Sequence, residues 1–337
     1  MRRSVACILA IGFLLCGQGA TARIVRMEIL HSEPAFGGQQ FGSTGAYERL
    51  TAKAYGEVDP ADPHNAIIQD LRLAPRNARG MVEYATSVEI LKPADLVRGN
   101  HVLFLELANR GNKVSLDVFD DDIPASSQLN ALTTAGDGYL MREGYTLVWF
   151  GWQQDVLPGD GRMVMDHVVA HNPDGSPITG IVRAEISAPR VTVAKTSLPI
   201  SASWLTLLRH DSYPSVSLDN RTPSPDGFLP SLTVRAREDE PRRSIPNAEW
   251  SFARCTDSGQ PQPDEKSLCY PSGFQPGLLY ELIYRAKDPV VMGLGFAVAR
   301  DLGSFLRNGR ADGAGNTNPV YQRIRSRSSR ARHRVGA

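Results

Sequence analysis

Acyl-transfer chemistry requires a nucleophile, a base and hydrogen-bond donors for the oxyanion, and this sequence offers a candidate only for the donors. Asn109-Arg110-Gly111-Asn112 follows an apolar run that predicts a buried strand. Gly111 would let a backbone N–H approach a substrate oxygen closely. Two alternatives stay open. The segment can be an ordinary turn in which glycine is needed only for its backbone dihedral angles, and Arg110 can form a structural ion pair.

No nucleophile can be assigned. The motif Gly-x-Ser-x-Gly, which presents a serine at a sharp strand-to-helix turn, occurs nowhere in the 337 residues. Gly175-Ser176 and Gly303-Ser304 lack its surroundings, and the second pair falls in the middle of a predicted helix. The sequence therefore predicts no complete catalytic triad.

Metal-binding patterns are equally weak. His167 and His171 are four residues apart, which suits a metal site on a helix. Residues 163–169 alternate like a strand, however, and positions four apart on a strand are separated by about 13 Å. We expect a surface or packing role for both histidines and a solvated loop at Asp120-Asp121-Asp122. We expect no metal and no organic cofactor.

Two of the four cysteines, Cys255 and Cys269, lie outside the apolar start of the chain. An even pair in an exported chain predicts a disulfide, with two free thiols as the alternative. The start itself has the pattern of a signal peptide over residues 1–22, with Arg2 and Arg3, then an apolar run, then Ala20-Thr21-Ala22. The run is shorter than the roughly 20 residues of a membrane span, so a secreted or periplasmic chain without a membrane segment is expected.

Global charge excludes one class of partner. The chain has 37 basic and 36 acidic residues, a formal net charge of +1, and thus no general affinity for nucleic acid or anionic membranes. The oligomeric state cannot be predicted from these numbers.

Hydrophobic patterning divides the chain into three parts. Over 23–156 we expect strands at 81–92, 101–107 and 145–150 and a helix at 130–143, which makes the last two strands a parallel pair. Residues 157–276 are rich in Pro and Ser, with short strands expected at 163–169, 178–188 and 232–236, and predict a β-rich insertion or cap. Residues 277–322 predict a strand at 278–284 and a helix from Pro289 to Leu306.

The last residues, 323–337, are almost entirely Arg, Ser and small side chains. The sharp break in character favours a shifted reading frame. An inert disordered tail and a basic binding segment are the alternatives.

Several motifs in order resemble a bacterial family of exported alpha/beta hydrolase domain proteins. They are Phe41-Gly42-Ser43-Thr44-Gly45-Ala46-Tyr47-Glu48, Gly56-Glu57-Val58-Asp59-Pro60, Ala74-Pro75-Arg76-Asn77-Ala78-Arg79-Gly80-Met81-Val82-Glu83-Tyr84, Asn109-Arg110-Gly111-Asn112-Lys113, Gly144-Tyr145-Thr146-Leu147-Val148-Trp149 with Gly151-Trp152-Gln153, and Ala286-Lys287-Asp288-Pro289. The resemblance implies an α/β class chain with part of an α/β-hydrolase fold: a mixed, partly parallel sheet with flanking helices, a β-rich insertion, and the C-terminal sheet strands missing. It also implies that Asn109–Asn112 is an oxyanion loop.

The implied activity of full-length relatives is carboxylic ester hydrolysis on a small ester substrate. This chain should be inactive alone, because the nucleophile elbow, the acid and the histidine would come later. The alternative is a non-catalytic exported binding module that uses the β-rich region.

Overall fold

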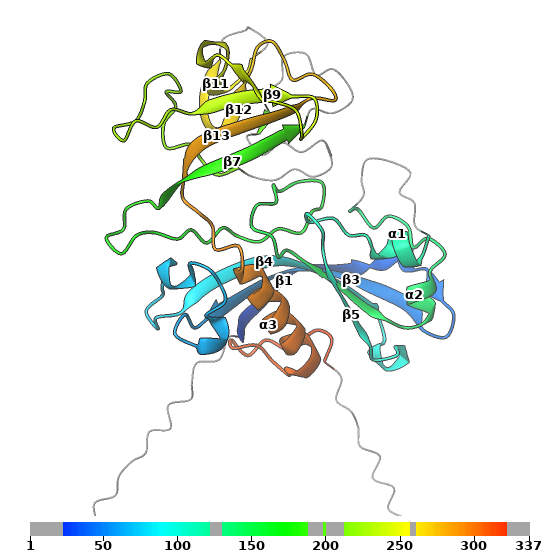
Figure 1. Ribbon diagram of the computed structural model, residues 1–337. Coiled ribbons are helices and arrows are strands. Elements are labelled where there is room, and N and C mark those ends of the chain that lie inside the picture. The colour runs from blue at the N-terminus through cyan, green and yellow to red at the C-terminus, as the bar shows by residue number, and fades with distance from the viewer. Residues whose placement is uncertain (1–22, 122–129, 188–197, 200–211, 257–260, 322–337) are drawn as a thin grey trace, which may run out of the picture.

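The computed structural model describes residues 23–121, 130–187, 198–199, 212–256 and 261–321. The predicted signal peptide and basic tail lie outside these ranges. The described residues form two bodies, with β1–β6 and the α-helices in one and β7–β13 in the other (Figure 1). None of the described helices has the length and apolar character needed to cross a bilayer.

The first body is built on one sheet. Its strands are β1 (Arg23–Pro34), β2 (Gln40–Phe41), β3 (Gly45–Val58), β4 (Val82–Pro93), β5 (Leu103–Leu107) and β6 (Thr146–Phe150). The order is β1-β3-β4-β6-β5, with β2 on β3. One face packs on α3 (Leu294–Asn308), and the other packs near α1 (Ser115–Phe119) and α2 (Tyr139–Arg142). Short 3-10 turns occur at Ala35–Gly38, Pro63–Asn65, Leu71–Leu73, Leu96–Arg98 and, in the second body, Asn247–Glu249.

The parallel pair predicted from the sequence is confirmed, since β5 and β6 run parallel from Leu103↔Thr146 to Leu107↔Phe150. The burial predicted for β5 is wrong. It lies at the edge of the sheet, its first four residues are half-buried, and Leu107 is exposed. A continuous apolar run cannot distinguish a central strand from an edge strand.

The second body holds two small antiparallel sheets. One has the order β10-β9-β13-β7, and the other has β11-β12-β8. The strands are β7 (Thr179–Ser187), β8 (Leu198–Pro199), β9 (Ser231–Arg235), β10 (Arg243–Ile245), β11 (Ser251–Arg254), β12 (Gln262–Cys269) and β13 (Leu279–Lys287). They enclose a core of their own that includes Trp250, Phe252, Tyr280 and Tyr284. Thus β13, which follows the predicted insertion, pairs with strands inside it.

The predicted α/β-hydrolase fold with flanking helices is wrong. The described part of the chain has thirteen strands and three α-helices, and every strand pairing there except β5–β6 is antiparallel. Only α3 is longer than five residues. The molecule is mainly β.

The missing helices have local causes. In 130–143, Leu132, Gly136 and Gly138 have positive φ, and only the four residues of α2 are helical. The long helix begins at Leu294 rather than Pro289, because Asp288 is left-handed and Val290 bridges Val169. The predicted strand at 163–169 is also wrong. Only single bridges form there, at Met165 and Val169.

The predicted disulfide is confirmed. Cys255 and Cys269 are bonded, with their Cα atoms 5.1 Å apart and 14 residues apart in sequence. Cys269 ends β12, opposite Ser251 of β11. The bond therefore closes the β11–β12 hairpin, and it is compatible with an extracellular location.

Replacing both cysteines by serine is expected to lower the free energy of unfolding by about 3 kcal/mol, because the unfolded chain regains the freedom of that loop. Urea unfolding of the double variant and of the wild type, with and without reductant, measures the difference. Equal stability of all four samples would contradict it.

The Asp312 carboxylate links the segment after α3 to β1 through hydrogen bonds. Asp312 is buried, and its two oxygens accept hydrogen bonds from Met27 N (2.7 Å), Ala314 N (2.9 Å), Asn316 N (2.8 Å) and Asn316 Nδ2 (2.9 Å). Burial by itself raises the pKa of Asp312, and these hydrogen bonds outweigh it, so the pKa lies below its ordinary value.

Asp312→Asn should therefore cost about 2–3 kcal/mol of stability at pH 7, because an amide cannot accept all four hydrogen bonds. The difference from wild type should be fully present above about pH 4, where the unfolded aspartate is ionised, and should disappear as the pH falls through the lower folded pKa. Urea unfolding from pH 7 to pH 2.5 measures it. A stability difference between the two proteins that grows as the pH falls would contradict this role of Asp312.

Candidate ligand-binding cleft

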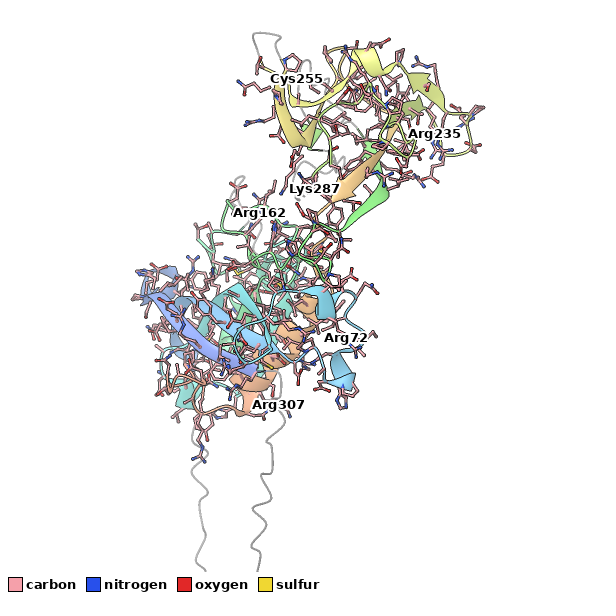
Figure 2. The ribbon with its side chains drawn as sticks, turned by 90° about the vertical axis from the view of Figure 1, so that its left-hand side faces the viewer. Arg72, Arg162, Arg235, Cys255, Lys287 and Arg307 are labelled. Carbon is pink, nitrogen blue, oxygen red and sulfur yellow. A yellow bond between two sulfur atoms is a disulfide. The ribbon has the colours of Figure 1, made fainter. Side chains whose placement is uncertain are left out.

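Two chain segments join the bodies, and one buried glutamine ties them together. The chain leaves the first body after β6 and returns from β13 to α3. Gln154 is fully buried. Its Oε1 accepts from Val168 N (2.5 Å) on the outgoing segment, and its Nε2 donates to Val291 O (2.6 Å) on the returning segment. Figure 2 places Arg162 on the side of the first body that faces the second, and Lys287 on the second body near that junction.

The junction contains a cleft of about 780 Å³. Its lining comes from six stretches of chain: the loop after β5, the segment after β6, β7, residues 212–214, β12, and β13 with the residues before α3. Representative side chains are Arg110, Asp155, His167, Tyr213, Lys266, Tyr284 and Met292. The volume suits a small organic molecule.

An ion pair lies in the lining of the cleft. The Arg110 guanidinium pairs with Asp155 Oδ2, and both side chains are about one-fifth to one-quarter exposed. Arg110 is held in the left-handed region (φ 53°), and its N–H donates to Gln153 Oε1 at 2.8 Å. Such a conformation is unfavourable for a non-glycine residue and often marks a functional site. Of the alternatives left open for Arg110, the ion pair is present.

One part of the wall is aromatic and apolar, whereas Arg183, Glu185, Lys266 and Asp288 add further charged side chains to the lining. Tyr284 is buried and donates its hydroxyl to Tyr213 O at 2.8 Å. Burial, and then the negative charge of Asp155, raise the pKa of Tyr213, while burial raises the pKa of Tyr284. Both phenols are therefore neutral at physiological pH. Val290 and Met292 complete this wall.

In the loop predicted from the sequence to be an oxyanion loop, three N–H groups already donate hydrogen bonds within the protein. Besides Arg110 N, Gly111 N donates to Ala108 O (3.3 Å) and Asn112 N to Asn109 O (3.0 Å). Gly111 has φ 78°, and a Cβ there would lie 2.7 Å from Met163 O. Close packing and the left-handed backbone thus explain this glycine. Only Arg110 of the four loop residues lines the cleft.

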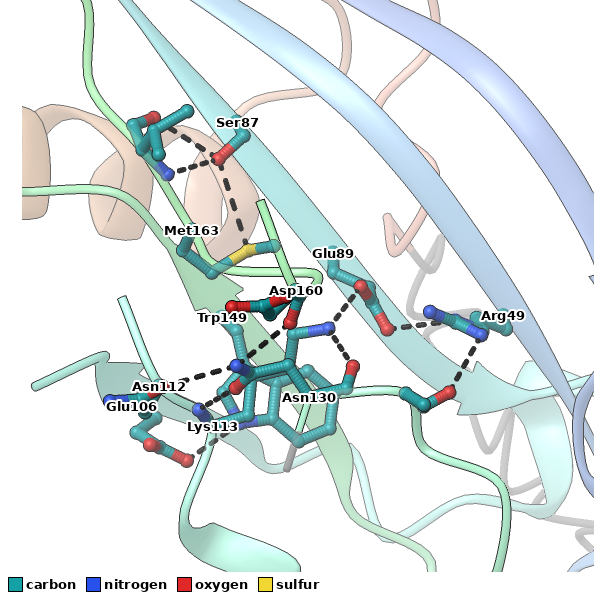
Figure 3. Close-up of polar contacts among 12 residues, drawn as sticks. Arg49, Ser87, Glu89, Glu106, Asn112, Lys113, Asn130, Trp149, Asp160 and Met163 are labelled. Carbon is teal, nitrogen blue, oxygen red and sulfur yellow. Dashed lines mark hydrogen bonds and ion pairs between the residues drawn. The ribbon is translucent and has the colours of Figure 1, made fainter. Parts of the chain in front are cut away.

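Behind the loop lies a buried charge network (Figure 3). The Lys113 ammonium contacts Glu89 Oε2 (2.6 Å) and Asn130 O (2.8 Å), and Arg49 Nε donates to Glu89 Oε1 (2.8 Å). Asn130 in turn bonds Asn112 Oδ1 at 3.1 Å. Burial lowers the pKa of Lys113, and the charge of Glu89 opposes this shift. The network therefore fixes the residues that follow the loop, because Lys113 N also donates to Asn130 Oδ1 at 2.8 Å.

The histidines and aspartates considered in the sequence differ in their burial and in whether they line a cleft. His167 lines the main cleft, and with His171, Arg76 and Glu83 it also lines a second cleft of about 410 Å³. No group of three or more metal-ligating side chains occurs in the described ranges. The prediction of a solvated loop fails for Asp120, which is fully buried and accepts from Leu140 N at 2.9 Å. Asp121 is exposed, and Asp122 lies outside the described residues.

Sequence reasoning missed most of the cleft. Asp155 follows a buried strand, and polar residues at such strand ends are a usable signal. Tyr213, Lys266 and Tyr284 carry no comparable signal, because the folding of the second body brings them to the junction.

Comparison of the chain with protein-family models, with curated proteins and with solved structures finds no match. The resemblance to exported alpha/beta hydrolase domain proteins therefore stays a prediction.

Proposed function

We propose that this chain is an exported, non-catalytic binding protein whose cleft holds a small organic ester. The observation that carries the proposal is the cleft itself, whose lining combines the Arg110–Asp155 pair with the aromatic side chains Tyr213 and Tyr284 and with apolar residues. Clefts of this volume at the junction of two bodies are typical small-molecule sites. The resemblance noted from sequence supports an ester as the ligand class, and the disulfide supports export.

Ligand-observed NMR with methyl phenylacetate tests the proposal. We expect binding to the wild type with a dissociation constant on the order of 1 mM or tighter, the range open to so small a ligand. Met292→Glu should weaken binding at least roughly fivefold, because it places a carboxylate on the apolar wall.

The matched control is Ile67→Glu, which adds the same charge at an exposed apolar residue of the first body outside the cleft. It should bind like the wild type. Absence of binding to the wild type, or equal losses in the two variants, would overturn the proposal.

The chain should not turn over esters. With p-nitrophenyl acetate, we expect hydrolysis no faster than with an equal concentration of an unrelated protein, because the sequence has no nucleophile elbow and the loop N–H groups bond internally. The measurement is p-nitrophenolate release with and without a serine-directed phosphonate. Turnover that the phosphonate abolishes would show that a catalytic serine exists.

A further inference from the structure

The two edges of the sheet in the first body differ in how they are protected from pairing with another chain. At one edge, β1 carries charged side chains such as Arg26 and Glu28, two register shifts along its pairing with β3, and Pro34 at its end. Charges, irregular pairing and proline all discourage the addition of a strand. The segment after α3 also occupies part of this edge, because Met27 N donates to Asp312.

At the other edge, β5 has none of these features. No strand in the described ranges pairs with its outer side, and its sequence Leu-Phe-Leu-Glu-Leu contains no proline. Its one charged side chain is engaged within the protein, since Glu106 accepts hydrogen bonds from Trp149 Nε1 at 2.6 Å and from Ser115 N at 2.9 Å. The β5 edge is therefore open and carries no unpaired charge.

The backbone of β5 is oriented for pairing on its outer side. Thr146 N donates to Val102 O at 3.0 Å, so the backbone carbonyl of Val102 faces β6. Successive residues of a strand direct their backbone polar groups to opposite sides. Those of Leu103, Leu105 and Leu107 therefore face away from β6, where another strand could bond them.

The surface beside this edge is apolar. Val102, Leu107, Val118 and Phe119 are exposed. The ring of Phe119 in α1 packs against Phe104 of β5, with ring centroids 5.4 Å apart. The exposed end of α1 therefore extends the apolar surface of the strand.

The charged side chains around β5 have partners inside the protein. In residues 102–116 they are Glu106, Arg110 and Lys113. Arg110 pairs with Asp155, and Lys113 pairs with Glu89. A highly charged partner would find no counter-charge on this stretch, whereas a second copy of the same stretch would bring no unpaired like charges together.

We propose that two copies of the chain associate through β5, whose outer edges pair antiparallel about a two-fold axis. Such an axis makes one edge complementary to itself, because each contact between two residues occurs twice. With the axis at Leu105, the middle residue of β5, Leu103 lies opposite Leu107 of the second copy. The two sheets then join into one. Residues 103–107 do not line the cleft, so this association is independent of the proposed ligand.

Sedimentation equilibrium and amide hydrogen exchange of the unaltered protein test the association. A five-residue edge makes a small interface, so we expect a dissociation constant on the order of 0.1 mM. Between about 10 µM and about 500 µM protein, exchange of the Leu103, Leu105 and Leu107 amides should slow roughly threefold, because these groups become hydrogen bonded. A mass of one copy at every concentration, or a dimer whose β5 amides exchange at an unchanged rate, would overturn the proposal.

Two variants then locate the interface. Leu107→Lys should raise the dissociation constant of the dimer at least roughly tenfold, because a lysine on an edge strand discourages pairing and the two-fold axis brings in a second one. The matched control is Leu30→Lys, which adds the same charge at an exposed leucine of β1, the opposite edge strand of the same sheet. It should dimerise like the wild type. Equal weakening in the two variants, or an unchanged dimer in Leu107→Lys, would refute pairing through β5.

Discussion

Glu89→Ala is expected to lower the free energy of unfolding by about 3–5 kcal/mol. Glu89 and Lys113 are a buried pair, with side chains 3% and 1% exposed and 2.6 Å between Oε2 and Nζ. Without Glu89, the ammonium keeps only neutral partners such as Asn130 O in a site that already lowers the pKa of Lys113. An uncompensated buried charge is among the costliest single changes in a protein.

Chemical denaturation measures the loss, and an exposed pair provides the control. Asp166 contacts Lys53 at 2.9 Å, but the two side chains are 53% and 34% exposed. Asp166→Ala should cost less than about 1 kcal/mol. The double variant Glu89→Leu/Lys113→Met should recover most of the stability, since it removes both charges and keeps the volume. Equal losses for Glu89→Ala and Asp166→Ala would contradict this reading of the network.

The second large effect is expected at Gly295, in the first turn of α3. A Cβ at this position would overlap the carbonyl oxygen of Trp152. Helix propensity alone predicts that Gly→Ala stabilises by up to about 1 kcal/mol. The overlapping atom belongs to the backbone and cannot move aside as the end of a side chain can. We therefore expect Gly295→Ala to lower the free energy of unfolding by about 3 kcal/mol. Displacement of α3 should also weaken ligand binding, because Met292 lies just before the helix and lines the cleft.

Gly293→Ala is the matched control, two residues earlier. There the nearest atom to a Cβ is Ile68 Cγ2 at 3.4 Å, an ordinary contact, and φ is −64°. Its stability should stay within about 1 kcal/mol of the wild type. Thermal and urea unfolding of the two variants compare the positions directly. A stabilised Gly295→Ala protein would show that α3 does not approach Trp152 so closely.

The sequence predicts local structure better than it predicts how the elements pack together. Alternation identifies β4, the apolar runs identify β5 and β6 as a parallel pair, and cysteine counting identifies the disulfide. Patterning did not reveal that β5 is an edge strand, because the neighbours of a strand are not encoded in its own residues. The helix predicted before β6 fails at left-handed positions such as Leu132, which the spacing of apolar residues does not reveal.

The candidate site shows the same division. Arg110 could be selected from sequence as a strand-end residue, and its ion-pair role was an open alternative. Its partner Asp155 is 45 positions away in the sequence, and Tyr284, which lines the same cleft, belongs to the second body. A cleft assembled from separate stretches leaves no spacing that a single sequence could display. Gly111 also shows that a glycine suited to catalysis can be required by packing alone.

Backbone amide chemical shifts during a titration with methyl phenylacetate show whether the ligand binds in the junction cleft. We predict that the largest changes fall together at Arg110, Asp155, Tyr213 and Asp288, with little change around Arg76 and His171 of the second cleft. Saturable changes centred on the second cleft, or on the exposed edge of β5, would show that the ligand binds outside the junction cleft.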